Sequence, residues 1–84
     1  MRKTRHIPVL VESFAVNLRT LRLARGITQE QLADECGLSI AYISLLERGG
    51  RVAPLNTVER IANAIGVAPH LLLAPPRSKN GTGA

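Results

Sequence analysis

Residues 28–49, TQEQLADECGLSIAYISLLERG, contain two short amphipathic stretches that meet at a single glycine, Gly37. Two helices that cross at roughly 90–120° need a small residue at the crossing, a flexible turn and apolar residues facing inward. Ala33 supplies the small residue and Gly37 the flexible one. The inward positions belong to Leu32, Cys36, Leu38, Ile43 and Leu46. The segment therefore predicts a helix–turn–helix pair whose second helix keeps one face free.

Helical periodicity continues on both sides of this pair. Before it, a helix is predicted from Pro8 to Arg25, ended by Gly26, with an apolar face of Val11, Phe14, Ala15, Leu18 and Leu21. After it, a helix closed by Gly66 is marked by Leu55, Val58, Ile61, Ala62 and Ile65, and a short fifth helix begins near Pro69. No stretch alternates as a strand would. The sequence predicts an all-α, five-helix domain over residues 8–76, preceded by a flexible basic arm (1–7) and followed by a disordered tail (77–84).

Local capping signals set the starts of the two central helices. Thr28 and Gln31 have the spacing of a capping box, in which a hydroxyl and an amide satisfy free backbone donors. Ser39 is a good N-cap for the next helix, which is predicted to run to about Arg48. The pair Gly49 and Gly50 then breaks the chain.

The formal net charge of +5 is carried by the two ends of the chain. Arg2, Lys3, Arg5, Arg77 and Lys79 lie there without an acidic residue, whereas residues 7–76 hold six arginines and six acidic residues. A basic balance favours a polyanionic partner, but here only through the ends and through local patches. Charge by itself does not decide whether that partner is a nucleic acid.

The sequence lacks the residues that several classes of function require. Cys36 and the distant His6 and His70 cannot form a zinc site of usual spacing, so no metal or other cofactor is expected. No catalytic triad, paired carboxylates or phosphate-binding glycine loop is present, so no enzyme is expected. A single cysteine fits a reducing cytoplasm. Glu12 interrupts the first apolar run, which argues against a secretory signal, and no stretch approaches the ~20 apolar residues of a membrane span.

Four segments within residues 14–73 occur together and in order: FAVNLRTLRLARG, ITQEQLADECGLS, YISLLERG and LNTVERIANAIGV. With them the chain resembles the Cro/C1-type (XRE family) helix-turn-helix proteins, a group of phage repressors and small bacterial regulators. Its short length and FxxNLRxLR start are most similar to single-domain regulators, including restriction-modification controller proteins, although antitoxins share the pattern. The resemblance implies a compact lambda-repressor-like fold and double-stranded DNA as the partner.

The resemblance also implies roles for individual residues. It makes residues 39–48 the recognition helix, with base-reading positions at Ser39, Ile40, Ala41, Ser44, Leu45 and Arg48, which helical spacing places opposite Leu38, Ile43 and Leu46. Phosphate contacts are implied for Thr28 and Gln29 and for Arg48 and Arg51. Tyr42 has two open roles, because its ring can stack in the core and its hydroxyl can reach a phosphate.

The recognition face departs from the usual base-reading chemistry. Arg, Lys, Gln and Asn generally make the specific contacts with base edges, whereas Ile40, Ala41 and Leu45 can only touch thymine methyl groups. Ser39 and Ser44 can each make a single hydrogen bond. We therefore predict T-rich half-sites, with DNA shape carrying much of the specificity.

Two other sets of residues have structural interpretations. The resemblance implies that Arg22 and Glu47 form a partly buried ion pair that locks the recognition helix to the scaffold, and Cys36 is predicted to be a packed core thiol. Leu71, Leu72 and Leu73 cannot all face one core, so at least one should be exposed. A homodimer interface is predicted at Ile65, Val67, Leu71 and Leu72, with His70 at or near it.

The leading hypothesis is a dimeric, sequence-specific DNA-binding transcriptional regulator, a repressor or autoregulator that binds a palindromic operator. The basic arm either lies in the minor groove or is an unused, solvated tail. The alternative function is a protein-interaction module, such as an antitoxin, whose apolar face of Ile40, Ala41 and Leu45 docks a protein partner.

Overall fold

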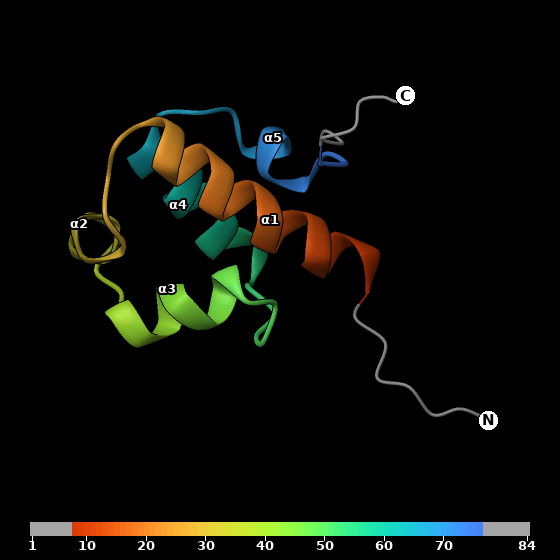
Figure 1. Cartoon of the computed structure of the whole chain (residues 1–84), viewed down its shortest axis with the longest axis horizontal. Helices are drawn as coiled ribbons and strands as arrows, with labels where there is room; N and C mark the ends of the chain where they lie inside the picture. Colours follow the sequence, from red (N-terminus) through yellow and green to blue (C-terminus); the bar gives the residue numbers. More distant parts are fainter. Residues whose placement is uncertain (1–7, 77–84) are drawn as a thin grey trace.

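The computed structural model describes residues 8–76, which form five helices and no strand. The helices are α1 (Val9–Ala24), α2 (Gln29–Cys36), α3 (Ile40–Glu47), α4 (Leu55–Ile65) and α5 (Pro69–Leu73). The all-α, five-helix prediction is therefore confirmed. Figure 1 shows the long α1 crossing the molecule, with α3 beneath it and α2 at one end. In the same view α4 passes behind α1, and α5 lies above α1, on the side opposite α3. None of the described helices is both long enough and apolar enough to span a membrane.

The starts of α2 and α3 follow the predicted caps. The Thr28 hydroxyl accepts a hydrogen bond from the Gln31 backbone N–H at 3.0 Å, and the Thr28 backbone N–H donates to the Gln31 side chain at 2.9 Å. The Ser39 hydroxyl accepts from the Tyr42 backbone N–H at 3.0 Å. Each cap satisfies a donor that the first helical turn leaves without a partner, so both helix starts are set by local chemistry.

The turn between α2 and α3 depends on Gly37. Its φ of +69° is left-handed, a conformation that is costly for residues with a Cβ. With Gly37 in this conformation, the Leu38 N–H reaches back to the Ala33 carbonyl at 2.9 Å and satisfies the end of α2. The chain can then enter α3 after only three residues.

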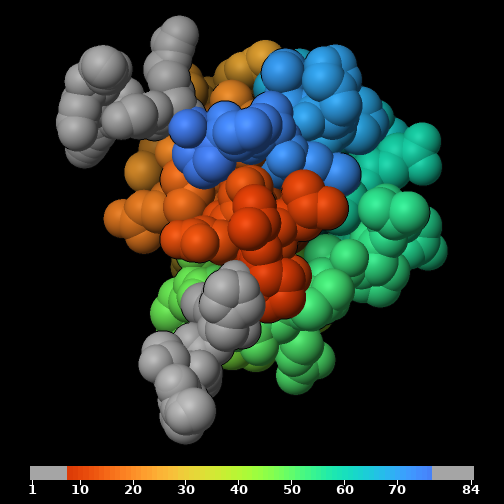
Figure 2. Space-filling model, turned by 90° about the vertical axis from the view of Figure 1, so that its right-hand side faces the viewer, coloured from red at the N-terminus to blue at the C-terminus, as the bar shows by residue number. Residues whose placement is uncertain are grey.

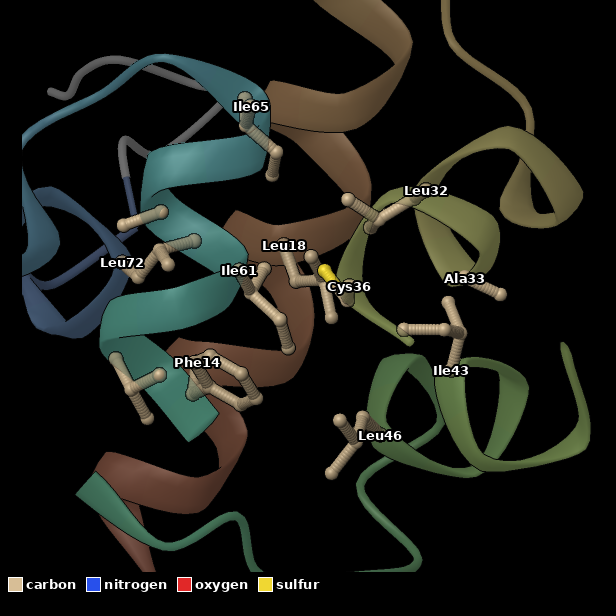
Figure 3. Close-up of a cluster of buried hydrophobic side chains, with 12 residues drawn as sticks. Phe14, Leu18, Leu32, Ala33, Cys36, Ile43, Leu46, Ile61, Ile65 and Leu72 are labelled. Atoms are coloured by element: carbon tan, nitrogen blue, oxygen red, sulfur yellow. The ribbon is translucent and has the colours of Figure 1, made fainter. Parts of the chain in front are cut away.

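All five helices contribute side chains to one apolar core. The fully buried side chains of Leu18, Leu32, Ile43, Leu46, Ile61 and Leu72 come from α1, α2, α3, α4 and α5. Cys36 lies among them, and burial raises the pKa of its thiol, with a smaller opposing effect of Arg60. A buried thiol with a raised pKa is an apolar packing group, as the sequence predicted. Figure 3 shows these side chains converging from their helices.

One predicted core residue lies outside the core. Leu55 is one of the apolar residues that mark the predicted fourth helix, but it is 76% exposed. It is the first residue of α4, and it borders a surface hollow at the edge of the domain. The inward face of α4 therefore begins only at Val58, because the first turn of the helix extends past the packed interior.

Polar side chains fasten the helices at their ends. Asn17 on α1 donates to the carbonyls of Leu72 and Ala74, at 3.0 and 2.6 Å, and so holds α5 against α1. Arg25 donates to the carbonyls of Ile65 and Gly66 at the end of α4. These bonds satisfy carbonyls that a helix end leaves free. They also fix the scaffold on which α3 is mounted.

Candidate nucleic-acid interface

The outward face of α3 is solvent-accessible along its whole length. Ile43 and Leu46 are fully buried and anchor the helix to the core. On the other side, Ser39, Ala41 and Arg48 are exposed, and Ile40 is 47% exposed. Ser44 and Leu45 are half-buried in the same row. The residues that the sequence placed on the outward face therefore do lie together on one accessible surface of α3.

This surface carries little charge. Ile40–Leu46 contains no ionisable group other than the Tyr42 phenol, and Glu47 is buried in an ion pair. Arg48, at the C-terminal end, is the cation of the row, and its guanidinium donates to the Ser44 hydroxyl at 3.1 Å. The surface thus combines apolar contact groups with two serine hydroxyls and one terminal arginine.

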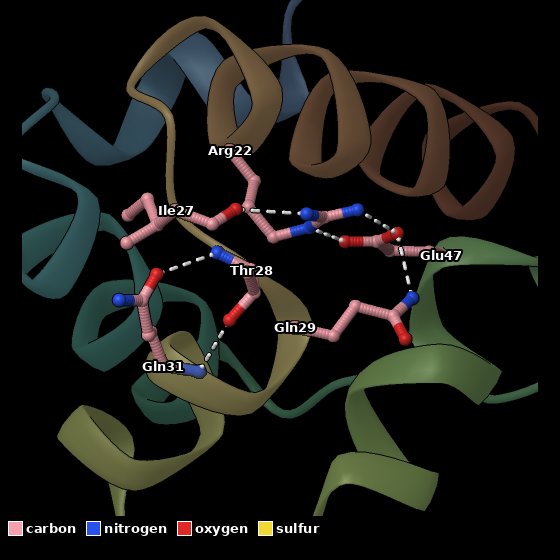
Figure 4. A network of polar contacts seen from close by, with 6 residues as sticks. All are labelled: Arg22, Ile27, Thr28, Gln29, Gln31 and Glu47. Atoms are coloured by element: carbon pink, nitrogen blue, oxygen red, sulfur yellow. Dashed lines mark hydrogen bonds and ion pairs between the residues drawn. The ribbon is translucent and has the colours of Figure 1, made fainter.

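Arg22 and Glu47 join α1 to the end of α3. The Arg22 Nε donates to Glu47 Oε2 at 2.6 Å, and Nη2 donates to Glu47 Oε1 at 3.1 Å. The side chains are only 7% and 2% exposed. Arg22 Nη1 also donates to the Ile27 carbonyl at 2.8 Å, so the loop before α2 belongs to the same network (Figure 4). A buried, bidentate ion pair fixes the direction of α3 relative to α1.

Gln29 is a member of this network that sequence reasoning missed. Its side-chain amide donates to Glu47 Oε1 at 3.0 Å and ties the first turn of α2 to the last turn of α3 (Figure 4). The sequence assigned Gln29 to a phosphate contact, which stays a prediction, as it does for the exposed Thr28. The helical spacing between positions 29 and 47 carries no signal of this bond, because the two residues lie on different helices.

The loop after α3 folds back on the helix. Its Gly50 N–H donates to the Leu45 carbonyl at 2.9 Å, and a Cβ at Gly50 would lie 3.3 Å from Leu45 Cδ2. The glycine therefore allows the loop to lie close to α3. Arg51 follows directly and is exposed. Its predicted phosphate contact, like that of Arg48, requires an accessible side chain, and both arginines have one.

Tyr42 and the two ends of the chain carry the remaining predicted contacts. Tyr42 is half-buried and packs against the core, and its phosphate contact stays a prediction. The basic arm lies outside the described residues, as does the tail after Pro76. Within residues 8–76, no group of three or more His, Cys, Asp or Glu side chains could hold a metal ion.

The predicted dimer interface needs correction at two positions. Ile65 is 3% exposed and Leu72 is 0% exposed, because both side chains fill the core of a single chain. They cannot present a surface to a second copy. Leu71 is 45% exposed and Val67 is half-buried, so these two keep their predicted place at a surface.

Comparisons with known proteins agree with this geometry. The sequence profile of a helix-turn-helix domain family matches residues 13–74. The chain is 42% identical over 65 residues to a hypothetical transcription factor of Neisseria meningitidis, covering 77% of this chain and 61% of that protein. It is 44% identical over 61 residues to the control protein C.BamHI of Bacillus amyloliquefaciens, covering 71% of this chain and 75% of the relative.

Solved structures show the same arrangement of helices. The crystal structure of a hypothetical transcription factor from Neisseria superposes with a TM-score of 0.77 at 37% identity, covering 89% of this chain and 90% of that one. The restriction-modification controller protein C.AhdI from Aeromonas hydrophila gives a TM-score of 0.71 at 37% identity, covering 74% and 94%. The chain therefore belongs to the Cro/C1-type helix-turn-helix family of DNA-binding transcriptional regulators.

Proposed function

We propose that this protein binds a palindromic operator as a homodimer, inserts α3 into the major groove, and represses or autoregulates transcription. The observation that carries the proposal is the division of α3 into a buried face, Ile43 and Leu46, and an accessible face from Ser39 to Arg48. Helix-turn-helix proteins insert the second helix of the pair in this way. Relatives named as control proteins and as an immunity repressor support this choice.

The operator symmetry follows from the proposed dimer. A twofold dimer presents two copies of α3, and half-sites then lie about one DNA turn apart, ~34 Å. In this proposal, regulation comes from protein concentration, because dimerisation by mass action sets the fraction of molecules that can occupy both half-sites. Occupancy of a promoter then occludes polymerase or recruits it.

Substitution Ala41→Glu tests the DNA-binding surface. Ala41 is exposed at the start of α3, so a glutamate fits without disturbing the core. Its carboxylate would face the phosphates and acceptor-rich groove edges, and like-charge juxtaposition costs several kcal/mol. We expect at least ~100-fold weaker binding to the DNA upstream of the protein's own gene, measured by gel shift at two salt concentrations with random competitor DNA.

A matched control has the same charge change elsewhere. Asn63→Glu adds one carboxylate at an exposed position of α4 and should bind DNA nearly as the wild-type protein does. Equal losses of DNA affinity in both variants would mean that the protein binds DNA through general electrostatic attraction and not through the α3 surface. Unchanged DNA binding by Ala41→Glu would contradict the proposal, and a stable complex with a protein partner in that case would favour the protein-interaction alternative.

The apolar face of α3 makes a second, chemical prediction. If Ile40 contacts a thymine methyl group, replacing that thymine by deoxyuridine should weaken binding about fourfold, because burying a methyl-sized group contributes ~0.8 kcal/mol. The Ile40→Ala variant should lose this sensitivity, since its side chain no longer reaches the methyl group. Footprinting identifies the positions to substitute. An operator read through guanines, insensitive to every such replacement, would exclude T-rich recognition.

A further inference from the structure

A hollow opens at the end of the domain where α1 begins. It has a volume of about 190 Å³, and eight of its nine lining residues are apolar, Arg51 being the exception. Phe14 and Val58, at its floor, belong to the core, while Leu10, Val52, Leu55 and Leu73 surround them. Figure 2 shows this face, with the start of α1 between the loop before α4 and the end of α5. Water can reach the hollow, so its apolar lining is solvated in a single chain.

The same face carries large apolar side chains that protrude into solvent. Leu55 is 76% exposed, Val52 68% and Leu10 60%, and all three border the hollow. Val9 lies next to them in sequence and is 72% exposed. Single exposed apolar residues are ordinary, but a contiguous group around an apolar depression is typical of an interaction site.

The size of the hollow indicates what occupies it. Small-molecule sites usually measure ~300–1,000 Å³, whereas an apolar cavity of ~150 Å³ holds a single benzene-sized group. A hollow of about 190 Å³ thus accepts one large apolar side chain. The protruding Leu55 of another molecule has that size and chemistry.

We propose that this face is the homodimer interface, with Leu55 of each protomer inserted into the hollow of its partner. A twofold axis requires one surface patch to be complementary to itself. Here the protruding group and the depression lie side by side on one face, so each protomer supplies both. This inference rests on the homodimer of the proposed function, and it replaces the interface around Val67 and Leu71 that the sequence predicted.

Such a dimer makes two demands on the surface of each chain. A stable interface buries ~800 Å² per partner, which is about 15% of the 5389 Å² accessible surface of this chain. Homodimer interfaces are also more apolar than the rest of a protein surface. The face formed by the start of α1, residues 51–55 and the end of α5 meets the second requirement, because eight of the nine residues that line its hollow are apolar. The groove at Leu71 is less apolar, since Asn17 and Thr20 line it with Val16.

The position of the face suits DNA recognition. Residues 48–54 connect α3 directly to it, and Arg51, which lies in this loop, also lines the hollow. A twofold axis through this face brings the C-terminal ends of the two α3 helices toward each other. Both copies of α3 can then face the same side of a DNA duplex, as a palindromic operator requires.

Sedimentation equilibrium of the full chain tests the interface. We expect Leu55→Glu to raise the dimer dissociation constant at least 100-fold, because the twofold axis places two carboxylates in two apolar hollows. Val52→Glu should have the same direction of effect. Both positions are highly exposed in the single chain, so circular dichroism should report unchanged helicity and melting of the monomer. Leu23→Glu is the matched control: Leu23 is also an exposed leucine, on the last turn of α1, and it does not line the hollow.

The outcomes separate this inference from the proposed function. Dimers that persist in Leu55→Glu and Val52→Glu but dissociate in Leu71→Glu would overturn the interface and leave the proposed dimer standing. A wild-type chain that stays monomeric, free and on DNA, would overturn both the interface and the dimer, while the Ala41→Glu comparison would still decide DNA binding. Loss of dimers in Leu55→Glu with binding retained to an isolated half-site supports the inference.

Discussion

The variant Glu47→Ala is expected to lose about 3–5 kcal/mol of unfolding free energy, the range found when one partner of a buried ion pair is removed. The Arg22 guanidinium would remain buried with two of its three hydrogen bonds to the network broken. Gln29 would lose its contact with α3 at the same time. A domain of this size holds only about 3–10 kcal/mol. Denaturant titration followed by circular dichroism should therefore show a largely unfolded or marginal protein.

Two further variants distinguish an unpaired charge from a general loss of packing. Glu59→Ala removes an exposed carboxylate from α4 and should change stability by less than ~0.5 kcal/mol. The double variant Arg22→Ala/Glu47→Ala removes both charges, so its loss should be smaller than the sum of the two single losses. Additive losses in this cycle would show that the two side chains are not energetically coupled.

Leu46→Ala is expected to destabilise the domain by about 2–5 kcal/mol, as large-to-small changes in a core do. Leu46 is 0% exposed and belongs to α3, so the cavity would lie directly beneath this helix. DNA affinity should fall with stability, because α3 would lose one of its two fully buried anchors. Denaturant titration gives the stability, and gel shift below the unfolding transition gives the affinity.

The matched control for Leu46→Ala is Leu23→Ala. It makes the same chemical change at a leucine that is 54% exposed on α1, and surface changes of this kind stay within ~0.5 kcal/mol. A Leu46→Ala variant as stable as this control would mean that α3 is not held by the core, and the division of α3 into a buried and an accessible face would then be wrong.

Local features of the fold could be predicted because their physics is local. Thr28, Gln31 and Ser39 cap helices through bonds to backbone groups three residues away, so a short sequence pattern contains both partners. Gly37 similarly indicates a left-handed backbone conformation at its own position. The buried anchors of α3 followed from 3.6-residue spacing, which relates a side chain to its own helix axis.

Errors arose where a residue's environment depends on distant segments. Periodicity gave Leu55 an inward angle on α4 but could not show that α4 begins beyond the edge of the core. Ile65 and Leu72 were expected on a surface, but both lie in the core that side chains of all five helices form. The partners of Gln29, Asn17 and Arg25 were also missed, since each bonds to a group 18 or more residues away.

The sequence by itself determined the helices, their caps and the turn at Gly37. It also determined the family, from which the expected role of α3 follows. These features follow from interactions within a few residues and from a recurring motif. Only the tertiary structure decided which apolar side chains remain exposed, as at Leu10, Val52 and Leu55, and how Gln29 joins the ion pair beneath α3. Burial and long-range hydrogen bonds depend on where the helix ends meet in space, and helical periodicity does not encode that position.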